Sequence, residues 1–363
     1  MSARVSRAGF LAALTALAVL AGGCAVDRGP ARLHFGMEDA PEGRRILYPP
    51  PPEVPRYMYA GQLIGEMNFH AAGGEARGAA ERLWRLVIGL DAPDAKRTVL
   101  QRPVAGAVDG NGRIFVTDAS RQAVFVFDEI AGELLVWDRA LGLTGFASPV
   151  GVAPGPDGHI YVADAELGMV ARLDGSGNPI RAIGKGVLRR PAGLARDPEQ
   201  KLLYVADTYA HDIKVFDDEG RLVQLIGRRG EGNGEFNYPT HLAFAHGELY
   251  VTDTLNSRVQ VFGAGGEVLD RKFGARGLYV GNLVRPKGVA VDNEGHVYVV
   301  ESYYDHLLVY DSRGEYLLPI GGTGQETGRF FLPAGVWVDS RNRIYVADMF
   351  NGRVMVFQFL GGG

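Results

Sequence analysis

Residues 249–262 read LYVTDTLNSRVQVF, two short apolar runs on either side of a polar turn. The first run ends in Asp253, and the second ends in Phe262. Short runs rich in Val, Ile, Tyr and Phe, bounded by Gly, Asp or Asn, predict β-strands. The carboxylate of the acid can accept backbone N–H groups in the turn that follows it. The stretch therefore predicts a β-hairpin whose acid is structural and not catalytic.

The same hairpin recurs six times over residues 101–359. An apolar run that opens on a proline precedes each hairpin, and the spacings between these prolines are 42 to 48 residues. The six prolines are Pro103, Pro149, Pro191, Pro239, Pro286 and Pro333. A fourth run follows in most repeats, for example at residues 222–226. Four short antiparallel strands in a period of about 45 residues are typical of a propeller blade. The sequence thus predicts an all-β, six-bladed β-propeller of four-stranded antiparallel blades.

Two stretches carry a resemblance to a known repeat family. Residues 286–292 read PKGVAVD and are followed by VYV at 297–299. Together with residues 249–262, they resemble NHL repeats. A WD40 assignment is weaker, because Trp137-Asp138 occurs once and no repeat carries the paired Gly-His. The resemblance implies a propeller fold, but it does not imply one function, because NHL propellers serve many.

The sixth repeat has three strands, so the ring needs a fourth strand from elsewhere to close. Residues 56–65 read RYMYAGQLIG and resemble the fourth strands, such as GRLVQLIG at 220–227. We expect them to form the outer strand of the last blade. The propeller domain is therefore placed at residues 56–363, with the blades from about residue 101. We expect a short amphipathic helix at residues 75–90, packed on the propeller, and a helix that dips into a membrane is the alternative.

The N-terminus has the features of an export leader at residues 1–23. Arg4 and Arg7 precede an apolar run at 10–20 that is too short to span a bilayer, and small residues lead into Cys24. The pattern resembles a bacterial lipoprotein signal, in which Cys24 becomes the acylated first residue of the mature chain. An ordinary secretory signal with an incidental cysteine is the alternative.

Acylation would hold the exported chain at a membrane surface. The alanine after Cys24 favours the outer membrane, by resemblance to bacterial sorting. Residues 24–55, which include four consecutive prolines at 49–52, are expected to form the lipid anchor and a semi-rigid, proline-rich linker.

Composition narrows the choice of partner. The formal charge of the chain is −4, and it becomes −6 without the two arginines of the leader. This balance argues against a nucleic-acid partner, which would need a basic face. The chain has a single cysteine, so neither a disulfide nor a thiolate metal site is expected, and no cofactor is predicted.

The turns between second and third strands carry unusual residues. In propellers these turns share one face with the loops that join the blades. Turn tips normally favour small polar residues, yet blades three to six have bulky apolar tips. Exposed aromatic residues are typical of protein interfaces. The predicted partner-binding residues are Tyr209, Leu255, Tyr303, Tyr304 and Phe350. The alternative is that each side chain packs on its neighbour and only caps its blade.

Three arginines precede first-strand prolines on the same face, at Arg102, Arg190 and Arg285. They fall in blades one, three and five, and would lie about 120° apart around a ring of six blades. Their guanidinium groups could bind an anion. The alternative is that each arginine pairs with a turn carboxylate such as Asp118 or Asp207.

Peptide-amidating lyases share the NHL-like fold, and in that family histidines around the central channel hold zinc. Two positions after the first-strand prolines, the chain has one histidine, His241. One ligand does not make a zinc site, so no metal site and no catalytic residue are predicted.

The function expected from the sequence is binding: a membrane-anchored scaffold propeller of the bacterial cell envelope, with an unidentified envelope protein as partner. Two alternatives stay open. One is a metal-dependent lyase or lactonase that uses the central channel. The other is a propeller that senses sugars or peptidoglycan.

Overall fold

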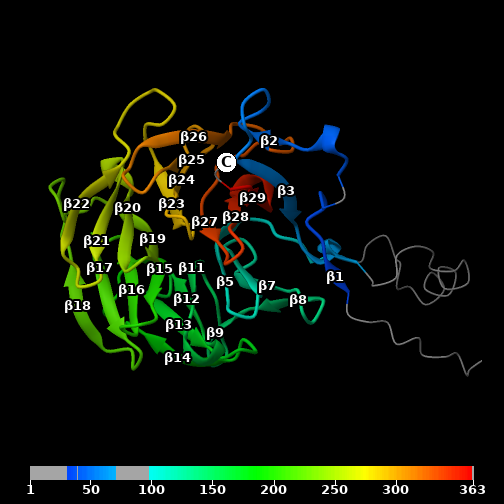
Figure 1. The fold of residues 1–363 in the computed structure, drawn as a ribbon. Coiled ribbons are helices and arrows are strands. Elements are labelled where there is room, and N and C mark those ends of the chain that lie inside the picture. Colours follow the sequence, from blue (N-terminus) through cyan, green and yellow to red (C-terminus); the bar gives the residue numbers. More distant parts are fainter. Residues whose placement is uncertain (1–30, 39, 71–97, 362–363) are drawn as a thin grey trace, which may run out of the picture.

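The structure is a computed structural model that describes residues 31–38, 40–70 and 98–361. Four-stranded sheets are arranged in a ring, and the colours of the chain run around it in sequence order (Figure 1). The helices of the described residues are all one-turn 3-10 helices, and none of them could span a membrane. The leader, Cys24 and the helix expected at 75–90 lie outside the described residues.

Each blade consists of consecutive antiparallel strands, ordered from the axis outward. Blade 1 is β5 (Pro103–Val108), β6 (Ile114–Asp118), β7 (Ala123–Asp128) and β8 (Glu133–Trp137); blade 2 is β11 (Pro149–Pro154), β12 (Ile160–Asp164), β13 (Met169–Leu173) and β14 (Pro179–Ile183). Blade 3 is β15 (Pro191–Asp197), β16 (Leu202–Asp207), β17 (Asp212–Asp217) and β18 (Leu222–Ile226); blade 4 is β19 (Pro239–Ala245), β20 (Glu248–Asp253), β21 (Arg258–Gly263) and β22 (Val268–Phe273). Blade 5 is β23 (Pro286–Val291), β24 (Val297–Glu301), β25 (His306–Tyr310) and β26 (Tyr316–Gly321); blade 6 has β27 (Val336–Val338), β28 (Arg343–Asp348) and β29 (Arg353–Phe359). The all-β, six-bladed propeller predicted from the sequence is confirmed.

Shorter elements complete the described chain. The short strands are β1 (Arg32–Leu33), β2 (Leu47–Tyr48), β4 (Phe69–His70), β9 (Arg139–Leu141) and β10 (Thr144–Gly145). The 3-10 helices are η1 (Glu42–Arg44), η2 (Glu66–Asn68), η3 (Pro156–Gly158), η4 (Thr254–Asn256) and η5 (Met349–Asn351).

The ring closes as the sequence predicts. Strand β3 (Tyr57–Leu63) pairs antiparallel with β29, and the register runs from Tyr57 opposite Phe359 to Leu63 opposite Val354. In Figure 1 the blue β3 lies beside the red β29. Strand β2 adds a fifth strand outside β3. Part of the segment assigned to the linker is therefore hydrogen-bonded to blade 6.

One predicted boundary differs. Strands β5, β11, β15, β19 and β23 begin at their prolines, but β27 begins three residues after Pro333. Before β27, the amide of Ala334 donates to the carbonyl of Ala347, and the amide of Ala347 donates to the carbonyl of Gly335. Pairing with β28 therefore starts at Ala334, but as an irregular stretch that precedes the regular strand.

The hydrophobic core is divided among the interfaces between blades. Each of the six interfaces has its own cluster of buried side chains, contributed by the facing sheets. Between blades 4 and 5, for example, Val259 and Val261 pack with Val299 and Leu308. Fully burying such a side chain contributes about 1.5–3 kcal/mol. The sheets therefore pack face to face around the axis, with the first strand of each sheet innermost. Their turns lie at the two ends of the ring.

We call the face that carries the inter-blade loops and the turns between second and third strands the upper face. The opposite, lower face carries the turns between first and second strands and those between third and fourth strands.

Candidate partner-binding face

The acids that end the second strands organise the upper face. Asp118 Oδ1 accepts the amides of Ser120 and Arg121, at 3.0 and 2.9 Å. Its Oδ2 accepts the amides of Gln101 and Arg102, at 2.6 and 2.9 Å. The predicted structural role is confirmed. The sequence did not reveal the second half of that role, in which the same carboxylate also fixes the loop entering the first strand.

The acids also fix the arginines before the prolines. The amide of Arg190 donates to Asp207 at 2.8 Å, and the amide of Arg285 donates to Glu301 at 2.9 Å. These contacts involve the backbone. The side chains of the three arginines make no ion pair with a carboxylate of the described residues. Pairing of the guanidinium groups with turn carboxylates, the alternative considered above, is therefore not what the structure shows.

The predicted tips lie on the upper face, as its turns require. Tyr209, Leu255, Tyr303 and Phe350 are exposed, and Tyr304 is half-buried. Turns held by buried carboxylates present these side chains to solvent. The structure thus places all five residues where a partner could reach them.

Aromatic rings pair on the upper face of blades 5 and 6. The rings of Tyr303 and Tyr304 meet edge to face at 4.9 Å, and those of Phe331 and Phe350 do so at 5.7 Å. Phe331 belongs to the loop between β26 and β27 and is itself 39% exposed. Sequence reasoning missed Phe331, because it examined the turn tips and not the inter-blade loops.

The loop between β22 and β23 contributes the most exposed apolar side chains of this region. Leu278 and Tyr279 are 82% and 83% exposed, and Val280 is 57% exposed. Leu278 and Val280 line a cavity of about 280 Å³ together with Tyr304 and His306. This loop was also missed. A run Leu-Tyr-Val beside a repeat boundary was the available signal.

Contacts continue the surface toward blade 3. The amide of Leu255 donates to the carbonyl of Asn237 at 3.0 Å, and Arg276, in the β22–β23 loop, donates to the carbonyl of Leu255 at 3.3 Å. The ring of Tyr238, next to Asn237, meets that of Tyr209 at 6.1 Å. The upper face of blades 3 to 6 thus carries a set of exposed apolar side chains, which we call the apolar arc: Tyr209, Leu255, Leu278, Tyr279, Val280, Tyr303, Phe331 and Phe350.

Two of the arginines lie against the ends of this arc. The guanidinium of Arg102 lies over the ring of Phe350 at 5.5 Å, and that of Arg190 lies over Tyr209 at 5.2 Å. A guanidinium over an aromatic face stabilises both groups and leaves the donors free at the edges. The structure therefore separates Arg190, in blade 3, from Arg102 at the junction of blades 6 and 1.

At the centre of the upper face the first strands approach closely. A Cβ added to Gly193 would lie 2.6 Å from the Cα of His241, and one added to Gly335 would lie 2.5 Å from the carbonyl oxygen of Val104. Glycine at these positions allows the strands to meet around the axis. His241 has the one large side chain among the six equivalent positions.

One of the two ring nitrogens of His241 has a hydrogen-bond partner. Its Nδ1 lies 3.2 Å from Thr240 Oγ1, while its Nε2 is enclosed and has no partner among the described residues. Burial and, to a smaller extent, the nearby charge of Lys287 lower the pKa of His241 to about 3. The imidazole is therefore neutral at pH 7. The described residues hold no group of three or more His, Cys, Asp or Glu side chains placed to bind a metal ion.

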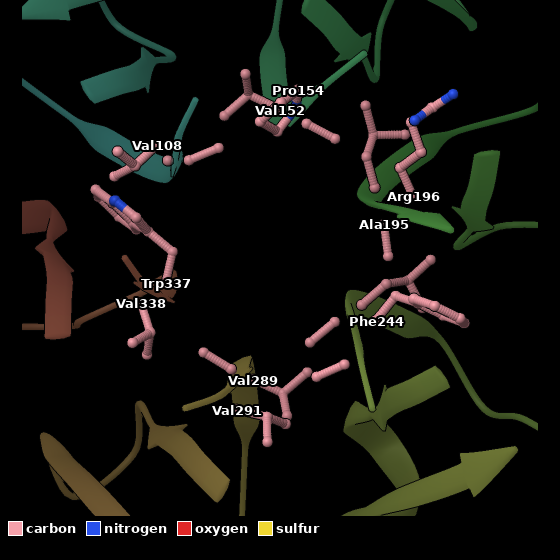
Figure 2. A pocket seen from close by; sticks show the side chains of 18 of the residues that line it. Val108, Val152, Pro154, Ala195, Arg196, Phe244, Val289, Val291, Trp337 and Val338 are labelled. Carbon is pink, nitrogen blue, oxygen red and sulfur yellow. The ribbon is translucent and has the colours of Figure 1, made fainter. Parts of the chain in front are cut away.

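A separate cavity of about 420 Å³ follows the axis on the lower side of this constriction. It is lined by the later halves of the six first strands, and Figure 2 shows their side chains around an open centre. Val108, Val289, Val291 and Trp337 are representative of its lining side chains, most of which are apolar. The side chain of Arg196 points away from the centre and pairs with Asp218 at 3.0 Å.

The ring of blades defines the class: the chain is a six-bladed β-propeller, and its repeats are similar to those of NHL-repeat proteins. Residues 198–272 and 281–362 match the family model described as "6-bladed beta-propeller". The protein brain tumor of Drosophila melanogaster is 32% identical over 140 residues, which are 38% of this chain and 13% of that protein. Human NHL repeat-containing protein 2 is 30% identical over 151 residues, 32% of this chain and 21% of that protein. The match thus spans about a fifth or less of these relatives.

Solved structures show the same fold at low identity. A virginiamycin B lyase from Staphylococcus aureus has a TM-score of 0.53 at 13% identity, with 84% of this chain and 92% of that chain covered. A gluconolactonase from Xanthomonas campestris has a TM-score of 0.56 at 17% identity, with 72% and 89% covered. At these identities the likeness concerns the fold alone.

Proposed function

We propose that this propeller is a membrane-anchored scaffold of the bacterial cell envelope that binds another protein through its upper face. The observation that carries the proposal is the apolar arc. Its members come from turns and inter-blade loops of four consecutive blades, and all of them are exposed on the upper face.

Physical chemistry favours a protein partner for such a surface. Contiguous exposed apolar side chains on a soluble domain are typical of interaction sites. Tyr, Phe and Arg are enriched at interface centres, because they combine a large apolar area with polar groups. Here two arginines stack on aromatic rings within or beside the arc. The arc therefore has the composition of an interface. The fixed turns of a closed ring would present it with little loss of conformational entropy.

The anchor is part of the same proposal. The leader pattern and Cys24 support acylation, and the outer membrane is the location that we propose. Arg32 in β1, which pairs with His70, comes only eight positions after Cys24. A fully extended chain of that length spans about 28 Å at most. An acylated Cys24 would therefore hold the propeller close to the membrane.

We also propose that the chain binds and does not catalyse. The acids that end the second strands on this face are buried acceptors of backbone amides, so they would not be available as catalytic groups. Metal analysis of the purified chain tests the rival lyase or lactonase function. A stoichiometric ion would favour the rival.

Affinity capture from envelope membranes tests the binding proposal. The baits are the parent chain, a variant with Tyr209, Tyr303 and Phe350 all changed to Ser, and a control with Val223 and Leu225 changed to Ser. The control residues are 53% and 57% exposed on β18, at the outer edge of blade 3. We expect the parent and the control to recover a protein that the triple variant loses. If all three baits recover the same proteins, the proposal fails.

A further inference from the structure

Basic side chains gather at the centre of the upper face, between blades 5 and 1. Arg285 and Lys287 flank Pro286 at the start of β23, and Arg102 precedes β5. The strands between them are packed closely: the amide of Gly288 donates to the carbonyl of Ala334 at 2.8 Å. On the other side of this segment, Gly335 approaches the carbonyl of Val104. The starts of β23 and β5 thus both adjoin the narrow start of blade 6, and the three basic residues lie on either side of it.

These three positive charges are not compensated within the described residues. Arg102, Arg285 and Lys287 form no ion pair with a described carboxylate. The acids nearest to them in the fold, Asp118 and Glu301, are buried and accept backbone amides. Burial lowers the pKa of Lys287, and the charges of Arg285 and Arg102 lower it further. Like charges that are brought together with partial loss of hydration favour the binding of a counter-charge.

We propose that Arg102, Arg285 and Lys287 form a binding site for a small oxyanion, a carboxylate or a phosphate. Guanidinium groups donate paired hydrogen bonds to either oxyanion, and an ammonium group adds a compact charge. This site differs from the arginine triad that the spacing predicts. Lys287 takes the place of Arg190, because the charges of Arg285 and Arg102 both act on Lys287.

The site borders the apolar arc. Ser302 Oγ donates to the carbonyl of Arg285 at 3.0 Å and precedes Tyr303, while Arg102 lies over Phe350. An acidic or phosphorylated group of a bound protein could supply the oxyanion, and so could a free small molecule. The inference does not require the proposed protein partner, because free anions test it directly.

The experiment measures the thermal unfolding of the purified full chain in citrate, inorganic phosphate or chloride at equal ionic strength. We expect citrate or phosphate to raise the unfolding temperature saturably, by about 2 °C or more at saturation, relative to chloride. An effect of citrate alone identifies a carboxylate site, and an effect of phosphate alone identifies a phosphate site.

Substitutions locate the effect. Arg285→Met and Lys287→Met should abolish the oxyanion response, and Lys287→Gln serves as a second charge-removing variant. Arg190→Met is the matched control, since it removes an arginine from the same repeat position, and it should keep the response. The proposal is overturned if neither oxyanion exceeds chloride in the parent, or if Arg190→Met loses the response as Lys287→Met does.

Discussion

The hydroxyl groups of Tyr57 and Tyr298 lie 3.3 Å apart, although 241 positions separate the two residues. Tyr57 is on the closing strand β3, and Tyr298 is on β24 of blade 5. Their rings meet edge to face at 6.1 Å. The closing strand therefore completes its own sheet and also contributes to the core between blades 5 and 6.

Removal of the Tyr57 side chain should destabilise the ring. Tyr57→Ala deletes a fully buried aromatic side chain, and such changes reduce the free energy of unfolding by about 3–5 kcal/mol. Tyr57→Phe loses one buried hydroxyl contact and should reduce it by about 1 kcal/mol. Denaturant unfolding measures both changes. Tyr279→Ala, on an exposed ring, is the control, and equal stability of Tyr57→Ala and Tyr279→Ala would contradict the closure described above.

The same region should make stability depend on pH. Asp292 Oδ2 accepts from Tyr298 at 2.8 Å and lies 2.9 Å from His296 Nδ1. The hydrogen bond to Asp292 raises the pKa of His296 above its usual 6.5. Burial acts to raise the pKa of Asp292, but the hydrogen bonds from His296 and Tyr298 outweigh it, and this pKa falls below 3.8.

The pKa shifts of His296 and Asp292 determine how the stability of the chain changes with pH. The stabilisation by protonated His296 is fully present below about pH 6.5 and is lost as the pH rises through the raised pKa. Asp292 stays ionised until the pH falls below 3.8. His296→Gln should therefore destabilise the chain most at about pH 5, by at most about 1 kcal/mol because the imidazole is partly exposed, and less at about pH 9. Unfolding at both pH values measures this difference, and a larger effect at the higher pH would contradict it.

The close approach of first strands gives a third prediction. An added Cβ at Gly193 would lie 2.6 Å from the Cα of His241 and 2.7 Å from the carbonyl oxygen of Thr240. Gly193→Ala should therefore reduce the free energy of unfolding by about 1–3 kcal/mol. Gly110→Ala is the matched control, since an added Cβ there meets nothing within 4 Å. Equal stability of the two variants would show that the strands are further apart than described.

The proposed anchor is tested in cells. Parent chain should incorporate labelled fatty acid and sediment with membranes, because more than one acyl chain gives stable attachment. Cys24→Ser should lose the label and appear in the fraction without membranes. If Cys24→Ser incorporates as much labelled fatty acid as the parent, Cys24 is not the acylated residue and the proposed anchor is wrong.

The repeat made the ring predictable from the sequence. The sequence of each blade contains a proline, then a strand that ends in an acid, and then a turn. These local signals are enough to predict the sheets. The closing strand was also predictable, because residues 56–65 carry the pattern of a fourth strand and the sixth repeat lacks one. The irregular start of blade 6 was not, since it depends on backbone contacts of Ala334 with Ala347 in β28 and with Gly288 in β23.

The site was predictable only in part. The tips Tyr303 and Phe350 follow from their fixed distance after an acid. Leu278 and Phe331 lie in loops of irregular length, for which sequence spacing gives no position. The grouping of Lys287 with Arg102, 185 positions apart, depends on the packing of β23 and β5 against β27, which no local pattern encodes.

The most direct test of the upper face as a binding surface is the dissociation constant of the captured partner. It should be measured for the parent, for Tyr303→Ser combined with Phe350→Ser, and for Val223→Ser combined with Leu225→Ser. We predict that the upper-face variant weakens binding by about 10-fold or more, as expected for aromatic residues central to an interface, while the β18 variant binds as the parent does. Parental affinity in the upper-face variant, or an equal loss in the β18 variant, would contradict the account.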